Sequence, residues 1–406
     1  MPDDTDARHD VSIGRRIQAI RVQRGYTQHG LAQRANVSYS NLTKVEAGHR
    51  AASPALTAAC ARALRVPVTD LTGQPYFDSL KKDQLEELIQ PLRHALANPL
   101  LPGELEPVRP LRDIRAQIAR LDAARLGGEY MPIGAAVPAL IDELLLLADT
   151  AAAGEAREQA YRALADAYRL GWSFVNKLGF TDLALLALER IQQCAPHAGD
   201  PYLQGVVCQG RSDYFLRHGA PEVSLREIRV LERELEDPVR RGDPRAMSMR
   251  GTLWLKTAVV SSRSCAPGSA DDVASQIGEA RDLAARIVGR PDPYQMCFDL
   301  TNVALHAAST QLDLGEAGRS VEMGAQIRFP AGWALNRTAH HYMDMARAHE
   351  RLGQRDRALE ALLEARSAAA VQTRYHPTTR ETVMALLRGR GTPSRELRAF
   401  ARWVGV

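Results

Sequence analysis

Residues 14–71 have the sequence GRRIQAIRVQRGYTQHGLAQRANVSYSNLTKVEAGHRAASPALTAACARALRVPVTDL. Isoleucines at helical spacing predict a first helix over residues 13–24, and Gly25 should end it as a C-terminal cap. Thr27 is placed to cap a second helix over residues 28–34 with its hydroxyl group. The stretch therefore begins as two short helices joined by a few residues.

A tight turn and three more helices should complete this unit. Asn36 lies in the turn after the second helix, and asparagine tolerates the left-handed backbone that such a turn usually needs. Ser38 should cap a third helix over residues 39–47, and Ser53, followed by proline, should open a fourth. A last helical turn covers residues 68–71. Two short helices across a tight turn, inside a five-helix unit, have the geometry of a helix-turn-helix.

The charge of this unit is strongly positive. Residues 11–67 hold one acid and nine basic residues, a net charge of +8, so the rest of the 406-residue chain carries −4 of the total +4. The basic residues are Arg15, Arg16, Arg21, Arg24, Arg34, Lys44, Arg50, Arg62 and Arg65. A small cationic unit on a mildly acidic remainder is typical of a protein that binds DNA.

Residues 14–71 resemble the XRE family of phage-repressor-like helix-turn-helix domains. The shared pattern consists of Thr27-Gln28, Leu31-Ala32, Val37-Ser38 and Glu46 with Gly48. The resemblance covers nearly the whole unit. It implies an all-α, five-helix domain of the lambda-repressor type that binds double-stranded DNA at specific sequences.

The resemblance also implies roles for individual residues on and near the third helix, which would enter the major groove, where base edges are distinguishable. The positions that match the DNA contacts of the family are Gln28, Ser38, Tyr39, Ser40, Thr43, Lys44 and Arg50. Gln28 would touch phosphate or support the reading helix. Tyr39 would contact DNA or stack on a neighbouring side chain, and Lys44 would contact a base or a phosphate.

A buried ion pair is implied by the same resemblance. Arg21 and Glu46 match a pair that ties the first helix to the third, which would explain the single acid in the unit. The chain departs from the family at Gly30, where a charged or polar helix former is usual, and at Asn36, where glycine is usual. Gly30 weakens the second helix by roughly 1 kcal/mol relative to alanine, but neither departure removes a DNA contact.

The remainder of the chain has the composition of a helical, globular protein, with 45% apolar, 25% charged and 5% aromatic residues. We predict a flexible N-terminus at 1–10, a helix-turn-helix domain at 11–73, a linker with one helix at 74–109, and a helical body at 110–406. The linker helix should span residues 80–97 with a kink at Pro91, and the proline-rich residues 98–110 should be irregular.

Residues 110–406 are predicted to form successive helical pairs. The pairs are 111–126 with 130–152, 156–178 with 182–194, 202–218 with 221–235, 247–262 with 269–288, 294–314 with 318–327, and 335–352 with 355–370, before a final helical segment that ends near residue 403. The pair at 335–370 resembles a tetratricopeptide repeat in Ala346, Leu352-Gly353, Ala358, Leu362 and Ala365. This resemblance implies a C-terminal α-solenoid of tetratricopeptide-like hairpins, with a concave surface that binds peptides or partners.

The body shows no catalytic motif, so we predict no enzyme activity, no cofactor and no metal. His340, His341 and His349 lack the spacing of a metal site. The five cysteines form no C-x-x-C pair and are predicted to be buried apolar side chains: Cys60, Cys194, Cys208, Cys265 and Cys297.

Candidate ligand-binding residues fall in the first helices of the pairs, which usually line the inner surface of such a body. They are Asn176, Arg211, Tyr214, Asn302, His306 and Asn336. Asparagine amides can hold a peptide backbone through a donor and an acceptor together. The alternative is that these amides are solvated or join neighbouring helices.

The sequence therefore predicts a homodimeric transcriptional regulator whose body senses a peptide or small-molecule effector, like the peptide-responsive quorum-sensing regulators that it resembles. A DNA-localised scaffold that recruits a partner protein is the main alternative, and a DNA-bound enzyme is a third.

The sequence offers little sign of membrane association. The longest apolar stretch, residues 135–148, is interrupted by Pro138, Asp142 and Glu143, and falls short of the ~18 residues that a membrane span needs. The first ten residues are acidic and polar, unlike a signal peptide. We therefore predict a cytoplasmic protein without a membrane partner.

Overall fold

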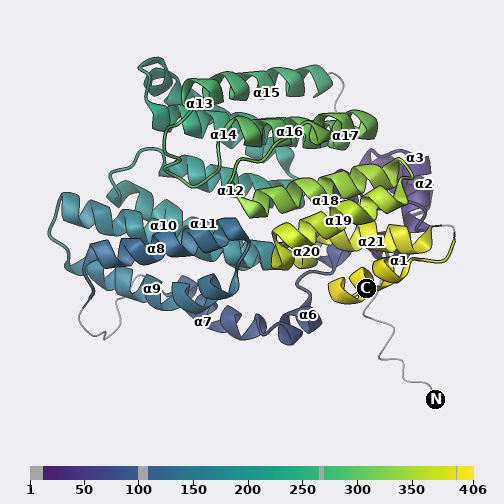
Figure 1. Ribbon diagram of the computed structural model, residues 1–406, viewed down its shortest axis with the longest axis horizontal. Helices are drawn as coiled ribbons and strands as arrows, with labels where there is room; N and C mark the ends of the chain where they lie inside the picture. The colour runs from purple at the N-terminus through teal and green to yellow at the C-terminus, as the bar shows by residue number, and fades with distance from the viewer. Residues whose placement is uncertain (1–11, 99–107, 265–268, 390) are drawn as a thin grey trace.

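The computed structural model describes residues 12–98, 108–264, 269–389 and 391–406, and all regular secondary structure within these ranges is helical. Figure 1 shows the N-terminal helices at one end of the molecule, beside the last helices of the chain. The all-α fold predicted from composition is therefore confirmed in the described residues.

The N-terminal unit, here called the head (residues 12–73), is a bundle of five short helices. They are α1 (Ile13–Gln23), α2 (Gln28–Ala35), α3 (Tyr39–Glu46), α4 (Pro54–Leu64) and α5 (Val68–Thr72). The head buries a small core of its own, in which Ile17, Leu31, Leu42 and Leu71 are almost fully enclosed. The predicted number and order of helices are confirmed here.

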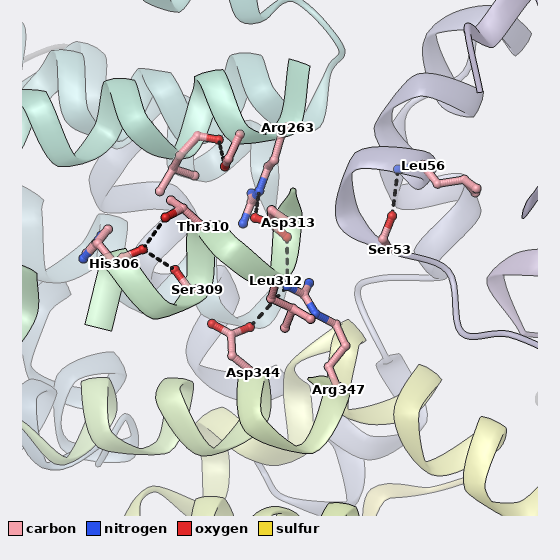
Figure 2. A network of polar contacts seen from close by, with 12 residues as sticks. Ser53, Leu56, Arg263, His306, Ser309, Thr310, Leu312, Asp313, Asp344 and Arg347 are labelled. Carbon is pink, nitrogen blue, oxygen red and sulfur yellow. Dashed lines mark hydrogen bonds and ion pairs between the residues drawn. The ribbon is translucent and has the colours of Figure 1, made fainter. Parts of the chain in front are cut away.

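The signals that begin and end these helices are local, and they act as predicted. The Thr27 hydroxyl accepts a hydrogen bond from the Gly30 amide at 3.0 Å. The Ser53 hydroxyl accepts one from the Leu56 amide at 3.2 Å, as Figure 2 shows. Asn36 ends α2 with a φ of 52°, in the left-handed region that its turn requires. Each cap satisfies backbone groups that a short helix leaves without partners.

The region after the head differs from the prediction of a single helix kinked at Pro91. It contains α6 (Phe77–Lys82), the 3₁₀ turn η2 (Glu86–Leu88) and α7 (Ile89–Ala97). The helix is interrupted at Gln84, whose φ is 58°. Pro91 instead lies in the first turn of α7, where the amide hydrogen that proline lacks would have no helical acceptor. Residues 99–107 of the predicted irregular stretch lie outside the described residues.

The body is a succession of antiparallel helices. They are α8 (Leu111–Gly127), α9 (Met131–Thr150), α10 (Glu155–Leu178), α11 (Thr181–Cys194), α12 (Leu203–Arg217), α13 (Pro221–Arg240), α14 (Pro244–Ser264), α15 (Ser269–Arg286), α16 (Leu300–Asp313), α17 (Ala317–Ala325), α18 (Leu335–Arg351), α19 (Arg355–Ala368), α20 (Ala370–Tyr375), α21 (Pro377–Arg388) and α22 (Arg395–Val404), with the 3₁₀ turn η3 (Ala195–His197) after α11.

Two stretches of the body depart from the predicted pairs. Residues 294–299 are not helical, because Gln295 and Cys297 adopt left-handed φ values of 53° and 60°. The helix begins instead at Leu300, where the Asp299 carboxylate accepts a hydrogen bond from the Asn302 amide at 2.7 Å. Beyond residue 370 the single predicted segment is three helices, α20 to α22.

Neighbouring helices of the body pack in sequence order, and alternate helices also meet. α14 contacts both α12 and α16, α16 contacts α18, and α18 contacts α8 near the start of the body. Figure 1 shows α8 and α10 on one side and α18 to α20 on the other. One hydrophobic core runs from Tyr76 before α6 to Tyr375 in α20. Residues 76–97 therefore pack as part of the body.

A buried ionic network joins three of these helices. Asp313 at the end of α16 accepts hydrogen bonds from Arg263 of α14 and from Arg347 of α18, each at 2.8 Å (Figure 2). Burial alone would raise the pKa of Asp313, but its attraction to the two guanidinium groups outweighs burial and lowers the pKa to about 2. The network fixes α14, α16 and α18 relative to one another.

Helix α9 is the one helix of the described ranges that is long and apolar enough to cross a membrane, judged by length and composition. It packs against α7, α8 and α10. Ile133, Val137, Leu140 and Leu144 on one of its faces are almost fully buried in the core. One apolar face of α9 therefore packs into the core.

Candidate DNA-binding interface

Helix α3 presents one polar face to solvent and one apolar face to the core of the head. The side chains of Leu42, Val45 and Glu46 are buried, whereas Ser40 and Lys44 are exposed. Tyr39 is 50% exposed, which is unusual for a side chain of its size. The exposed face is therefore free to contact a partner without rearrangement of the head.

The buried face of α3 is held by one carboxylate. Arg21 of α1 donates from Nε to Oε1 of Glu46 at 2.8 Å and from Nη2 to Oε2 at 2.9 Å. This hydrogen-bonded pairing raises the pKa of Arg21 despite its burial. Gln28 of α2 donates from Nε2 to Oε2 of Glu46 at 2.8 Å. Glu46 thus joins α1, α2 and α3, and Gln28 is bonded to the carboxylate that anchors α3.

The remaining predicted DNA contacts surround the exposed face of α3. Ser38 caps the helix by accepting a hydrogen bond from the Asn41 amide at 3.4 Å. Thr43 is half-buried and donates to the Ser40 carbonyl at 3.1 Å. Arg50 lies in the turn after α3, is exposed, and donates to Oδ1 of Asn41 at 2.9 Å. The structure therefore gathers these residues at one helix and its flanking turns.

Two residues of this surface, His29 and Asn41, were not predicted from the sequence. The His29 ring lies 5.8 Å from the Tyr39 ring, which is consistent with the stacking alternative for Tyr39. Asn41 orients Arg50 through its side-chain amide. Helical spacing could have identified Asn41, because it lies beside Ser40 and three residues before Lys44.

The head is docked on the body by polar contacts at the start of α1, at Gly48 and on α4. Glu381 of α21 accepts a hydrogen bond from the Ile13 amide, at the start of α1, at 2.8 Å. Arg388 donates from Nε to the Gly48 carbonyl, just after α3, at 2.9 Å. Arg62 of α4 donates to the Gly219 carbonyl at 3.2 Å. Residues more than 150 positions apart form these contacts, so no local sequence signal predicts them.

Among the predicted ligand residues, those on α10 and α12 are engaged with other side chains. Asn176 accepts a hydrogen bond from Arg217 at 2.9 Å. Arg211 forms ion pairs with Glu189 at 2.6 Å and with Glu227 at 3.0 Å. The Tyr214 ring stacks on the His218 ring at 3.9 Å. The contacts of Asn176 and Arg211 join neighbouring helices, whereas the Tyr214 ring packs against the end of its own helix, α12.

The other three ligand candidates lie on α16 and α18. Asn336 donates to the Arg125 carbonyl at 3.1 Å. His306 is hydrogen-bonded through Nδ1 to the Asn302 carbonyl at 2.9 Å, and burial together with the charge of Arg337 lowers its pKa to about 3. The Oδ1 atoms of Asn302 and Asn336 are buried and have no hydrogen-bond partner among the described residues. Such atoms are costly unless something else binds them.

The described cysteines are buried or half-buried and take no part in the exposed face of α3. Cys60, Cys194 and Cys208 are buried free thiols, and Cys297 is half-buried. Burial raises the pKa of Cys60 and of Cys194 to about 12, which suits apolar packing. Cys265 lies outside the described residues. Within the described ranges, no group of three or more His, Cys, Asp and Glu residues is placed to hold a metal ion.

Comparison with known proteins places the similarity in the head. A family of helix-turn-helix domains matches residues 12–72. The chain is also 40% identical, over 58 residues, to a Bacillus subtilis (strain 168) protein named uncharacterized HTH-type transcriptional regulator YazB. The aligned region is 14% of this chain and 84% of that protein. No solved structure matches the chain.

Proposed function

This chain belongs, through residues 12–72, to the helix-turn-helix family of transcriptional regulators, and we propose that it reads a specific DNA sequence with α3. One observation carries the proposal: Tyr39, Ser40 and Lys44 face solvent on a helix whose other face is locked to α1 and α2 through Glu46. A rigid helix with exposed polar side chains suits the major groove, where each base pair presents a distinct pattern.

Arg50 and Lys44 would supply charge to the phosphate backbone, and Ser38 would supply a hydroxyl. Phosphate contacts position a reading helix but carry little sequence information, whereas contacts to base edges specify the site. Tyr39 and Ser40, at the N-terminal end of α3, are the residues placed to reach base edges. This division of roles gives each side chain a separate experimental signature.

The proposal includes a homodimer in the cytoplasm. A single small head buries little DNA surface, and helix-turn-helix proteins commonly bind two half-sites about 34–36 Å apart. A dimer would place two α3 helices at that spacing. The body is the larger part of the chain and would supply the dimer contact.

The body, in this proposal, is a tetratricopeptide-like solenoid that senses a peptide or small molecule. Its antiparallel hairpins packed in sequence order support this assignment. The head is tied to α21 through Glu381 and Arg388, so a ligand that changes the packing of the body would also move the head. Signalling would then follow from a shift between two arrangements of the body.

Selection of DNA from a random pool by the full-length protein tests the central claim. An enriched motif should be protected in a footprint by the wild type and by Arg226→Ala, which removes an exposed cation from α13. Tyr39→Ala and Lys44→Ala should weaken that protection while circular dichroism stays unchanged.

Enrichment of no motif, or equal protection by all four proteins, would refute the assignment of α3. Specific DNA binding that no extract component alters, together with a stably co-purifying protein, would favour the alternative of a DNA-localised scaffold. Detection of turnover by the DNA-bound protein would instead revive the third alternative, an enzyme.

A further inference from the structure

Basic side chains from separate elements of the body gather around one place. They are Lys177 of α10, Arg217 of α12, and Arg337 and His340 of α18, here called the basic cluster. All four are half-buried. Arg217 reaches Asn176, the neighbour of Lys177, at 2.9 Å, and the His340 ring lies 5.2 Å from the His376 ring. Elements distant in sequence therefore bring positive charge together.

These groups are close enough to shift one another's pKa values. Burial lowers the pKa of Lys177 to about 7, and the positive charges of Arg337 and Arg217 contribute to that shift. Burial, followed by the charge of Lys177 and then of Arg337, holds the pKa of His340 well below its ordinary value. Shifts of this kind indicate basic groups that share one poorly solvated region, where burial and the neighbouring charges disfavour protonation of Lys177 and His340.

Acidic side chains balance the cluster only in part: Asp344 of α18 lies 3.9 Å from Nε2 of His340. Asp213 of α12, which acts electrostatically on Lys177 and Arg217, forms its ion pair with Lys256 of α14 at 2.7 Å. Among the described residues, no ion pair joins Lys177, Arg217 or Arg337 to an acid within 4.0 Å. In the neighbouring network, by contrast, Arg263 and Arg347 are both matched by Asp313. The basic cluster therefore carries more basic groups than carboxylates paired with them.

Partly buried charges of one sign cost folding free energy unless something compensates them. We infer that the basic cluster is a binding site for a small anion with two or more negative charges, carried on phosphate or carboxylate groups. Arg217 and Arg337 have the planar donor geometry that suits both groups, and Lys177 adds a point charge. The anion site itself does not depend on the proposed function. The claim that the bound anion is the effector that alters DNA binding does rest on it.

The site lies where a ligand could affect the whole body. It draws on α10, α12 and α18, which belong to the early, middle and late parts of the stack (Figure 1). An anion held between them would favour the arrangement in which these helices converge. Because His376 immediately precedes α21, which carries Glu381 and Arg388, the site is also linked along the chain to the contacts that hold the head.

Thermal unfolding of the full-length protein tests the site with two probes, inorganic pyrophosphate and citrate. Each probe that binds should raise the unfolding midpoint in proportion to the logarithm of its concentration. Lys177→Met and Arg337→Met should each weaken the apparent affinity about tenfold or more. Arg226→Met removes one cation from the exposed surface of α13 and should leave the shift unchanged.

The head also attracts anions, so Lys44→Ala is measured in parallel and should keep the full shift. A response to pyrophosphate alone would identify phosphate chemistry, and a response to citrate alone carboxylate chemistry. Absence of any shift with both probes, or an equal shift in the Lys177→Met and Arg337→Met variants, would overturn the inference.

A second measurement needs no ligand. Without any anion, Lys177→Met should raise the unfolding midpoint, because it removes an uncompensated charge; a lower midpoint would contradict the argument. The outcome is also separable from the proposed function. A protein that binds pyrophosphate through the basic cluster but selects no DNA would leave this inference standing and remove the regulator.

Discussion

At the scale of single residues, the head depends on one buried acid. Glu46 accepts hydrogen bonds from Arg21 and Gln28, and both members of its ion pair are almost fully buried. Such a pair contributes little compared with an apolar replacement of both partners, but loss of one partner strands the other charge. The sequence hints at this role, because Glu46 is the single acid among the basic residues at 11–67.

Glu46→Leu should therefore destabilise the head by about 3–5 kcal/mol, because Arg21 is left buried without its carboxylate. Amide hydrogen exchange in α1 and α3 of the full-length protein measures the loss. The double variant Arg21→Met/Glu46→Leu should recover a large part of it, since no charge is then stranded. If the double variant is as unstable as the single one, the ion pair is not the reason for the effect.

Gly14 makes a different single-residue prediction, based on space. A Cβ atom at this position would overlap the carbonyl oxygen of Val45, so the backbones of α1 and α3 approach too closely to leave room for a methyl group. Gly14→Ala should cost about 1–3 kcal/mol by overpacking, seen as faster exchange in α1 and α3. Gly278→Ala in α15 meets nothing within 4 Å and should slow exchange there through its helix propensity. Slower exchange in both variants would contradict the packing argument.

At the scale of elements, local signals predict local structure well. The caps at Thr27 and Ser53 and the turn at Asn36 need only their immediate neighbours, and the sequence places them correctly. The break at Gln84 and the non-helical residues before Leu300 were missed, because left-handed φ values at non-glycine residues depend on surrounding packing. The docking of α1 on α21 was also missed, since its partners lie 368 positions apart.

That docking contact can be tested at Glu381. Burial raises the pKa of Glu381, while the hydrogen bond from the Ile13 amide lowers it. Glu381→Ala removes the acceptor at the start of α1 and should cost about 1–3 kcal/mol of docking free energy. Exchange of the first-turn amides of α1 should quicken. Glu396→Ala, an exposed acid on α22, is the matched control and should have no effect on them. Unchanged exchange in both variants would show that the contact does not hold the head.

At the scale of the whole molecule, positive charge gathers in two places, the head and the basic cluster. The head carries exposed cations that an external polyanion can contact, whereas the basic cluster carries partly buried basic groups inside the body. The sequence revealed the first place by simple counting. It could not reveal the second, because Lys177 and Arg337 come together through the packing of helices 160 residues apart.

The basic cluster predicts how stability depends on pH. The pKa of Lys177 is about 7 in the folded protein, compared with an ordinary value of about 10.4. Between these values the unfolded chain binds more protons at this residue, so the free energy of unfolding should rise with pH from about 7 to about 10.4. Below about pH 7 the penalty is complete and constant. The charged or titratable groups acting on or near Lys177 are Arg337, Asp213, Arg217, Arg125, His340 and His376.

Urea unfolding of the wild type and Lys177→Met, at about pH 6, 7, 8 and 9, isolates this contribution because other groups cancel in the difference. The variant should be the more stable protein near pH 6, and its advantage should shrink as the pH rises. Saturating pyrophosphate should remove the trend in the wild type, because a bound anion raises the pKa of Lys177 towards its ordinary value. A difference that stays constant with pH would show that Lys177 is protonated throughout, and that the body already balances its charge.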